Sequence, residues 1–239
     1  MLGLKRGDIP RYVLLPGDPA RATRIAAFFD DSKKICDIRA YLAYTGRFKG
    51  IPVSVCSTGI GGPSASICLE ELIHAGAEVF IRIGTSGKFD DSVDVGSIIL
   101  VTAAARDDGT TRDYVPLEFP AVADYTVTDA LRKASRQLGV SVRIGLCRSG
   151  DAMCNEMRAY EKWRGKKILC SDAETSTVFV ISTLRGARAG ALLVVDGPPF
   201  EGPPLETVQN EVTDHAVDSM IRTALAGVEF MDSSERKQP

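Results

Sequence analysis

One stretch of the chain, Val79 to Gly87, limits the possible folds more than any other. Val79–Ile83 is a short apolar run that carries one arginine, Arg82, and it ends abruptly in Gly-Thr-Ser-Gly. A short apolar run next to glycines is typical of a strand buried in a sheet. A guanidinium on such a strand is costly unless an anion meets it. Arg82 therefore faces either a bound oxyanion or a buried carboxylate, and this run alone favours neither.

The position of Arg82 along its strand indicates a ligand site. It lies near the carboxyl end of the strand, where open α/β sheets bind ligands. Gly84 and Gly87 allow the backbone to approach a ligand, and Thr85 and Ser86 add hydroxyl donors. The stretch predicts a small oxyanion held by one arginine, hydroxyls and backbone N–H groups.

Strand-like and helix-like segments alternate along the 239 residues, with no linker and no internal repeat. The expected strands cover 12–15, 35–45, 51–58, 79–83, 97–103, 140–147, 168–170 and 189–195. The expected helices cover 20–29, 65–75, 128–138, 156–163, 174–184 and 206–230. This alternation predicts one α/β domain over residues 1–239, with a mixed central β-sheet flanked by helices on both faces. We expect the polar tail, 233–239, to be frayed.

Two glycine-containing turns stand between an expected strand and an expected helix. In the first, Pro16-Gly17-Asp18-Pro19 leads into a helix whose first turns carry Arg21 and Arg24, a setting that favours anions. The second is the run 59–64, Gly-Ile-Gly-Gly-Pro-Ser, which lacks the spacing and the acidic partner of a dinucleotide fingerprint. The second turn therefore indicates close backbone approach to a ligand rather than NAD binding.

Composition excludes several classes of function. The formal net charge is −2, so no positive field indicates nucleic acid, and no apolar run approaches the roughly 20 residues that span a bilayer. The six cysteines form no C-x-x-C pair, and no metal-binding motif is present. We expect a cytoplasmic protein with reduced thiols, no metal site, and no nucleic-acid or membrane partner.

Four runs in order resemble the nucleoside phosphorylases of the uridine phosphorylase and hexameric purine nucleoside phosphorylase type. They are Pro16-Gly-Asp-Pro-x-Arg21, Ser57-Thr-Gly-Ile-Gly-Gly-Pro-Ser64, Ile81-Arg-Ile-Gly-Thr-Ser-Gly87 and Pro116-Leu-Glu-Phe-Pro-Ala-Val-Ala-Asp124. The resemblance covers nearly the whole chain. It implies phosphorolysis of a nucleoside to a free base and ribose 1-phosphate, with inorganic phosphate as co-substrate and no other cofactor.

The resemblance also implies a role for particular residues. The residues expected to bind phosphate are Gly17, Arg21, Arg39, Arg82 and Thr85. Those expected at the ribose are Ile60, Ala173 and Glu174, and those at the base are Met153 and Asp196. Asp196 would act as the acid that protonates a purine leaving group, with Arg82 as its catalytic partner at the phosphate. The assembly implied is a hexamer built from dimers, in which Arg39 is donated to a neighbouring subunit.

The choice between purine and pyrimidine depends on two regions. Uridine phosphorylases recognise uracil with a Gln-x-Arg pair in a longer insertion after the stretch that matches Ser149-x-Asp151, and no Gln-x-Arg exists here. Val194–Phe200 instead resembles apicomplexan-type purine nucleoside phosphorylases. We therefore predict a purine nucleoside phosphorylase, with uridine phosphorylase as the alternative.

Two departures from the family pattern leave further alternatives open. The family's Glu-Met-Glu reads Asp172-Ala173-Glu174 here, and Met153-Cys154 replaces the aromatic pair at the base. A nucleosidase that uses water, or a catalytically weakened nucleoside-binding homologue, would also be consistent with these changes. Phosphate-dependent release of base separates the phosphorylase from both.

Overall fold

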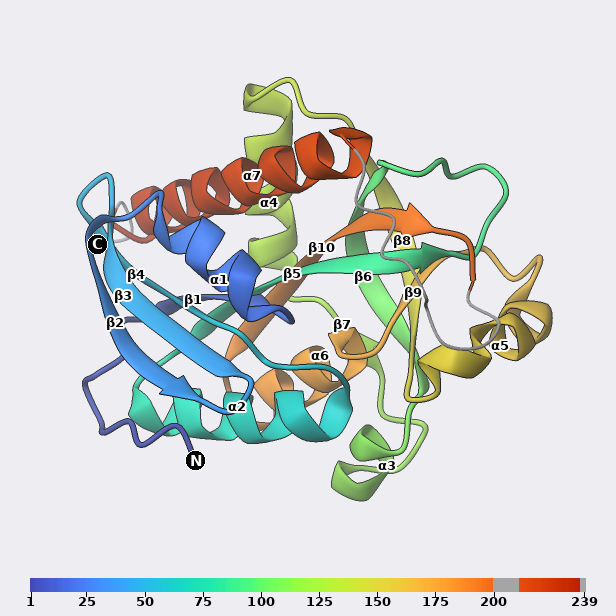
Figure 1. The fold of residues 1–239 in the computed structure, drawn as a ribbon, viewed down its shortest axis with the longest axis horizontal. Coiled ribbons are helices and arrows are strands. Elements are labelled where there is room, and N and C mark those ends of the chain that lie inside the picture. The colour runs from blue at the N-terminus through green and yellow to red at the C-terminus, as the bar shows by residue number, and fades with distance from the viewer. Residues whose placement is uncertain (200–210, 237–239) are drawn as a thin grey trace.

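The computed structural model describes residues 1–199 and 211–236, which form a single α/β domain (Figure 1). The strands are β1 (Tyr12–Pro16), β2 (Asp30–Ile38), β3 (Tyr41–Phe48), β4 (Ile51–Cys56), β5 (Val79–Lys88), β6 (Ile98–Asp107), β7 (Ala121–Val122), β8 (Val142–Gly150), β9 (Ile168–Asp172) and β10 (Arg188–Gly197). The helices are α1 (Pro19–Ala26), α2 (Gly62–Ala75), α3 (Thr110–Tyr114), α4 (Tyr125–Gln137), α5 (Glu156–Trp163), α6 (Thr175–Leu184) and α7 (Glu211–Glu235), with a short 3-10 turn at Met153–Asn155.

In the described part of the chain the strands form one mixed sheet in the order β10-β6-β8-β9-β5-β1-β4-β3-β2, and β7 pairs with β6. Strand β10 also pairs with β5, so β5, β10, β6, β8 and β9 close on themselves like a barrel. The remaining strands extend from β5 as an open sheet. The predicted mixed central sheet is confirmed. The barrel-like closure was not part of the prediction, because sequence periodicity identifies strands but not their pairing.

Three parallel strands bring their carboxyl ends together at one edge. Strand β1 pairs with β5 in parallel, with Pro16 opposite Ile83, and β10 pairs with β5 in parallel, with Val194 opposite Thr85. The first six residues of β5, Val79 to Gly84, are buried, as the apolar run predicts. The turns after β1 and β10 therefore start beside the Gly-Thr-Ser-Gly end of β5.

Helices cover both faces of the sheet (Figure 1). On one face α2 and α6 pack through fully buried side chains such as Leu72 and Phe179. On the other face α1, α4 and α7 pack through Ile25, Leu131 and Met220. These helices pack apolar side chains against the sheet, which is the arrangement expected from the alternation of strands and helices. This confirms the predicted α/β class.

The final helix differs from the expected one at its end. The expected helix ran from 206 to 230, and its first five residues lie outside the described part of the chain, as does Phe200. Helix α7 continues to Glu235, so the first residues of the tail 233–239 are helical rather than frayed. Glu235 accepts hydrogen bonds from Arg11 and from Arg188, which holds this end of α7 to the start of β1 and β10. Within the described residues, no helix has both the length and the apolar character needed to cross a membrane.

Candidate active site

Arg82 is a buried guanidinium at the fourth position of β5, and only 3% of the residue is exposed. The expected strand end at Ile83 is wrong, because β5 continues through the Gly-Thr-Ser-Gly run to Lys88. Its Nε donates to Asp172 Oδ2 at 2.7 Å, and its Nη2 donates to Glu174. Its Nη1 is buried and has no hydrogen-bond partner among the described residues. Burial acts to lower the pKa of Arg82, but the adjacent Glu174 and Asp172 carboxylates outweigh it, and the pKa is raised. The sequence left open whether Arg82 meets a buried carboxylate or a bound oxyanion. The structure shows the buried carboxylates, and the Nη1 group can still donate to an oxyanion.

Gly84 is required for the position of Arg82. A Cβ at Gly84 would lie 2.8 Å from Arg82 Nη2 and 3.0 Å from its Cζ. Real Cβ atoms do not approach so closely, and the other close atom, on Leu193, belongs to the packed core. The glycine that the sequence suggested for close approach to a ligand therefore makes room for the arginine itself.

Asp172, at the end of β9, is a hub of hydrogen bonds. Besides Arg82, it accepts from Ser149 Oγ at 2.7 Å, from Thr175 Oγ1 at 2.5 Å and from the Thr175 N–H at 3.1 Å. These contacts tie β8, β9 and the start of α6 to β5. The sequence shows Asp172 both as a departure from the family pattern and as a carboxylate at a strand–helix junction, and the second feature is the signal for this role.

Glu174 joins Arg82 to the glycine turn before α2. Its Oε1 accepts from the Gly61 N–H at 2.5 Å, while Oε2 accepts from Arg82. Burial raises the pKa of Glu174, with Arg82 acting in the opposite direction. Ile60, next to Gly61, is 74% exposed, and Ala173 is half-buried. The Gly61–Glu174 hydrogen bond therefore brings the turn that contains Ile60 close to the Ala173-Glu174 segment.

Arg21 comes to the same edge from the first turns of α1. Asp18 caps this helix by accepting from the Ala20 and Arg21 N–H groups at 2.9 and 3.3 Å. The pKa of Arg21 is lowered, first by burial and also by the nearby positive charge of Arg82. Two guanidiniums that repel each other beside a helix N-terminus make a site that an anion would stabilise. Arg24 does not take part, since it pairs with Asp218 of α7 at 2.8 Å.

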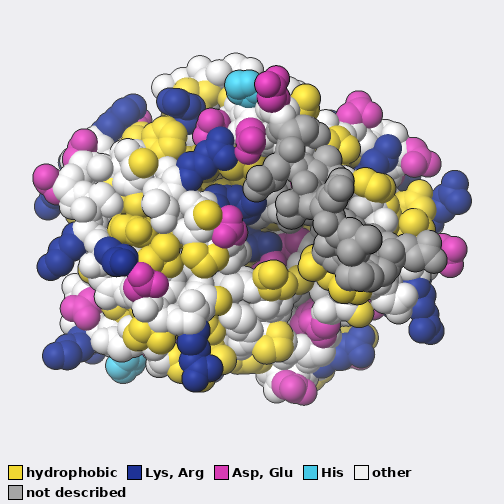
Figure 2. Space-filling model, viewed as in Figure 1, with side chains coloured by type: hydrophobic (Ala, Val, Ile, Leu, Met, Phe, Trp, Pro, Cys, Tyr) yellow, Lys and Arg dark blue, Asp and Glu magenta, His cyan; other side chains and the backbone are white. Residues whose placement is uncertain are grey.

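Asp196 is the last residue but one of β10 and lies near Arg21. The Thr85 hydroxyl and the Arg21 guanidinium both lie near enough to influence the Asp196 carboxyl group. Burial is the largest influence on this carboxyl group, and it raises the pKa of Asp196 above the ordinary value. Figure 2 shows a hollow near the middle of this face of the molecule, with basic and acidic side chains at its floor.

The other residues predicted for the site, Gly17, Met153 and Arg39, lie in three different turns. Gly17 lies against the second glycine turn, because a Cβ there would be 3.4 Å from the Gly59 carbonyl oxygen. Met153 is 38% exposed in the 3-10 turn before α5. Arg39 is exposed in the turn between β2 and β3 with φ 58°, and within the described residues no hydrogen bond or ion pair joins it to the others.

Sequence reasoning missed one residue at this edge, Glu156, which opens α5. It is 4% exposed, and its carboxyl group lies over Gly87 at the end of β5. Nothing in the sequence of the short helix marks it, since a glutamate in the first turn of a helix is ordinary. Only the packing of α5 against β5 shows where it lies. Across the described residues, no cluster of His, Cys, Asp and Glu side chains is suited to a metal ion.

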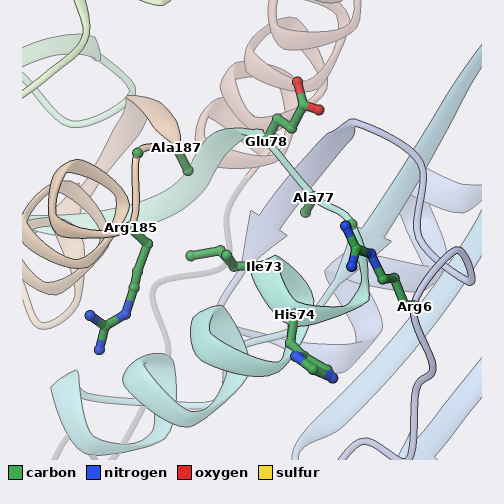
Figure 3. Close-up of a pocket in the computed structure, with 9 residues that line it drawn as sticks. Arg6, Ile73, His74, Ala77, Glu78, Arg185 and Ala187 are labelled. Atoms are coloured by element: carbon green, nitrogen blue, oxygen red, sulfur yellow. The ribbon is translucent and has the colours of Figure 1, made fainter.

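A cavity of about 410 Å³ lies at the opposite, amino end of β5 and β10. Ile73, His74 and Glu78 line it together with Arg185 and Arg6, whose side chains point in different directions (Figure 3). Arg185 is already held by Glu70, at 2.9 to 3.2 Å. The cavity contains none of the residues predicted for the site, and its charged groups do not converge on one ligand.

Residues 11–230 match the family described as the phosphorylase superfamily, and the chain belongs to this family. The uridine phosphorylase of Treponema pallidum is 39% identical over 96% of this chain and 93% of its own length. The uridine phosphorylase of Klebsiella aerogenes is 34% identical over 93% and 95%. The guanosine phosphorylase of Halorubrum lacusprofundi is 37% identical over 81% of each chain. These matches confirm the resemblance drawn from the motifs and the expectation of an enzyme of the nucleoside phosphorylase class.

Proposed function

We propose that the chain catalyses phosphate-dependent cleavage of uridine to uracil and ribose 1-phosphate. Most of the similar relatives are named uridine phosphorylases and match 81–96% of the chain, and one is a guanosine phosphorylase that matches 81%. This supports uridine phosphorylase, the alternative of the sequence analysis, better than the purine enzyme that the Val194–Phe200 run favours. Uridine is therefore our first candidate substrate.

The observation that carries phosphate dependence is the buried Nη1 of Arg82, which has no partner among the described residues and lies near a second guanidinium, that of Arg21. A buried donor without a partner costs about 1–3 kcal/mol, more for a charged group, and an oxyanion would satisfy it. In the proposed site Arg82 and Arg21 bind two phosphate oxygens, Thr85 adds a hydroxyl, and Gly17 lets the backbone come close. Charge-assisted hydrogen bonds of this kind are the strong ones. A water-using nucleosidase would have no need for this pair.

The ribose would lie between the phosphate and the turn at 59–62, where Glu174 can accept hydrogen bonds from its hydroxyls, with Ile60 and Ala173 beside it. A phosphate oxygen then attacks C1′ while the bond from C1′ to the base nitrogen breaks. The electron pair of that bond leaves with the base, and the ribose carries positive charge in the transition state. The negative charges of phosphate and Glu174 stabilise it, and in-line positioning supplies much of the remaining acceleration.

A purine nucleoside is the second candidate, and Asp196 is the specific observation that favours it. Its raised pKa lets a carboxyl group hold a proton closer to neutral pH. Such a group can share that proton with purine N7 as the bond to ribose breaks, and a pyrimidine has no nitrogen at that place. Among the described residues, as in the sequence, no Gln-x-Arg pair is available for uracil.

A panel of nucleosides assayed with and without phosphate tests the proposal. Uridine, inosine, guanosine, adenosine and cytidine would be followed by release of free base. We expect base release only with phosphate, and faster with uridine than with any purine nucleoside. Equal release without phosphate would identify a nucleosidase, and binding without any release would identify a weakened homologue. Faster cleavage of inosine or guanosine would establish the second candidate instead.

We also propose that the active enzyme is a homo-oligomer, with Arg39 completing the phosphate site of a neighbouring subunit. The support is the exposed position of Arg39 at the β2–β3 turn, away from any ion pair in the described residues. A hexamer built from dimers is the assembly that the family resemblance implies. Phosphate is the co-substrate, and the proposal uses no other cofactor.

A further inference from the structure

Glu156 is a buried carboxylate that the roles assigned so far do not use. A Cβ built on Gly87 would lie 2.7 Å from its Oε2 and 3.2 Å from its Oε1. The carboxyl group therefore fills the space over Gly87 that a side chain would otherwise take. Because β5 ends at Lys88, this space is at the same edge of the sheet as the phosphate residues.

Strand alternation shows which side of β5 the carboxylate occupies. Thr85 and Gly87 are two residues apart and face the same side of the strand, whereas Arg82 faces the other side. Strand β10 pairs with β5 at Val194–Thr85 and at Gly197–Gly87, so Asp196 lies beside the stretch of β5 over which the Glu156 carboxyl group is placed. Thr85 and Gly87 are about 7 Å apart along the strand, a distance that a planar nucleobase can span.

The packing of helix α5 holds Glu156 in place. It is the first residue of α5, and Tyr160, one turn later, packs edge-on against the buried ring of Phe89 just after β5, with centroids 5.6 Å apart. Met153, already expected at the base, lies in the turn that leads into α5. Helix α5 and the turn before it thus carry an acceptor and an apolar side chain, and we expect the base beside them.

We propose that Glu156 is a specificity-determining residue that accepts a hydrogen bond from the imino N–H of an oxo base. This inference rests on the proposed function and deepens it. The partner is N3–H in uracil and N1–H in hypoxanthine or guanine, so the chemistry is shared by both candidate substrates. An ionised carboxylate can only accept hydrogen bonds. Cytosine N3 and adenine N1 carry lone pairs there and would be repelled.

Wild-type kinetics provide the first test. We compare kcat/KM for uridine with cytidine, and for inosine with adenosine, in saturating phosphate. A site built around an N–H group rejects the analogue that lacks it strongly, so each ratio should be at least about a hundredfold. Ratios near one for both pairs would overturn the assignment of Glu156. Absence of any phosphorolysis would instead be a failure of the proposed function, and the panel without phosphate shows it separately.

The variant Glu156→Gln gives the second test, since an amide can donate as well as accept. We expect the ratio of kcat/KM for uridine to that for cytidine, and for inosine to that for adenosine, to fall at least about tenfold. With an oxo base a hydrogen bond to a charged group is lost, and with an amino base the new amide can donate to the ring nitrogen. The KM for phosphate should not change. The matched control is Glu161→Gln on the exposed face of the same helix, which should keep the wild-type ratio. If Glu156→Gln keeps the wild-type ratios of kcat/KM between oxo and amino nucleosides, the proposal is overturned, whatever the absolute kcat/KM of the variant.

Discussion

Arg82 and Glu174 form an ion pair in which neither side chain is more than 6% exposed. Because we assign the arginine to phosphate and the glutamate to ribose, this contact joins the two halves of the proposed site. Burying two charges is expensive unless each is also hydrogen-bonded. Here Asp172 holds the other side of the guanidinium and the Gly61 N–H holds the other carboxylate oxygen. These hydrogen bonds therefore hold Arg82 and Glu174 in position, and we expect phosphate and the nucleoside to bind beside them.

Arg82→Ala should damage binding and stability together. It removes the main phosphate donor, so the KM for phosphate should rise about 10- to 100-fold. It also leaves Asp172 and Glu174 buried without their cation, which should lower the free energy of unfolding by about 3–5 kcal/mol at neutral pH. Steady-state kinetics and urea denaturation measure the two effects. Ordinary phosphate kinetics in a folded Arg82→Ala protein would contradict the site.

Arg21 and Arg24 form a matched pair for testing the phosphate site, since they lie one turn apart on α1. Arg21→Ala should raise the KM for phosphate at least about tenfold, because it removes a charge-assisted contact. Arg24→Ala should leave that KM unchanged, since its guanidinium pairs with Asp218 at the surface. Equal effects of the two substitutions would show that only general positive charge matters there.

Much of the fold follows from local sequence patterns. The buried run at 79–83 and the alternation of strands with helices identify the α/β class. The expected strand end next to Arg82 is wrong, because β5 continues to Lys88. Pairing is different, because the contact of β10 with β5 joins residues more than a hundred positions apart, Val194 and Thr85. No local pattern encodes such a contact. Barrel closure could therefore not be predicted.

The same limit applies to the side chains of the site. Arg82 could be placed from its own strand, but its partner Asp172 comes from another strand. Glu156 lies over Gly87 only because α5 packs there, and a glycine in the sequence does not say whose side chain fills its space. The motifs suggested roles for Arg21, Thr85 and Asp196 through family resemblance, whereas their common location is a consequence of parallel pairing among strands.

Asp196→Asn separates the two candidate substrates. If purine N7 takes a proton from this carboxyl group, kcat for inosine or guanosine should fall about 10²–10⁴-fold, the usual effect of losing a general acid. The kcat for uridine should change little, since uracil has no N7. Initial rates with both kinds of nucleoside provide the measurement. A large loss with uridine would mean that Asp196 acts on phosphate or ribose instead.

The same substitution should change the pH dependence of stability. The pKa of Asp196 is raised in the folded protein, so the folded state binds the proton more tightly than the unfolded state. That contribution is fully present at acidic pH below the unfolded pKa, and it is lost as pH rises through the folded pKa. Asp196→Asn should therefore gain stability relative to the wild type across this window. Denaturation at a series of pH values measures the gain, and a constant difference would contradict it.

Mixed oligomers test whether Arg39 is shared between subunits. Arg39→Ala and Arg21→Ala should each be nearly inactive at low phosphate, because every site lacks one arginine. In a mixture, a subunit with Arg39→Ala keeps its own Arg21 and can receive Arg39 from an Arg21→Ala neighbour. Unfolding and refolding the two variants together should therefore restore part of the activity, while separate refolding should not. Light scattering verifies that both variants assemble. If mixing restores nothing although mixed oligomers form, or if an isolated monomer is fully active, Arg39 does not complete a neighbour's site.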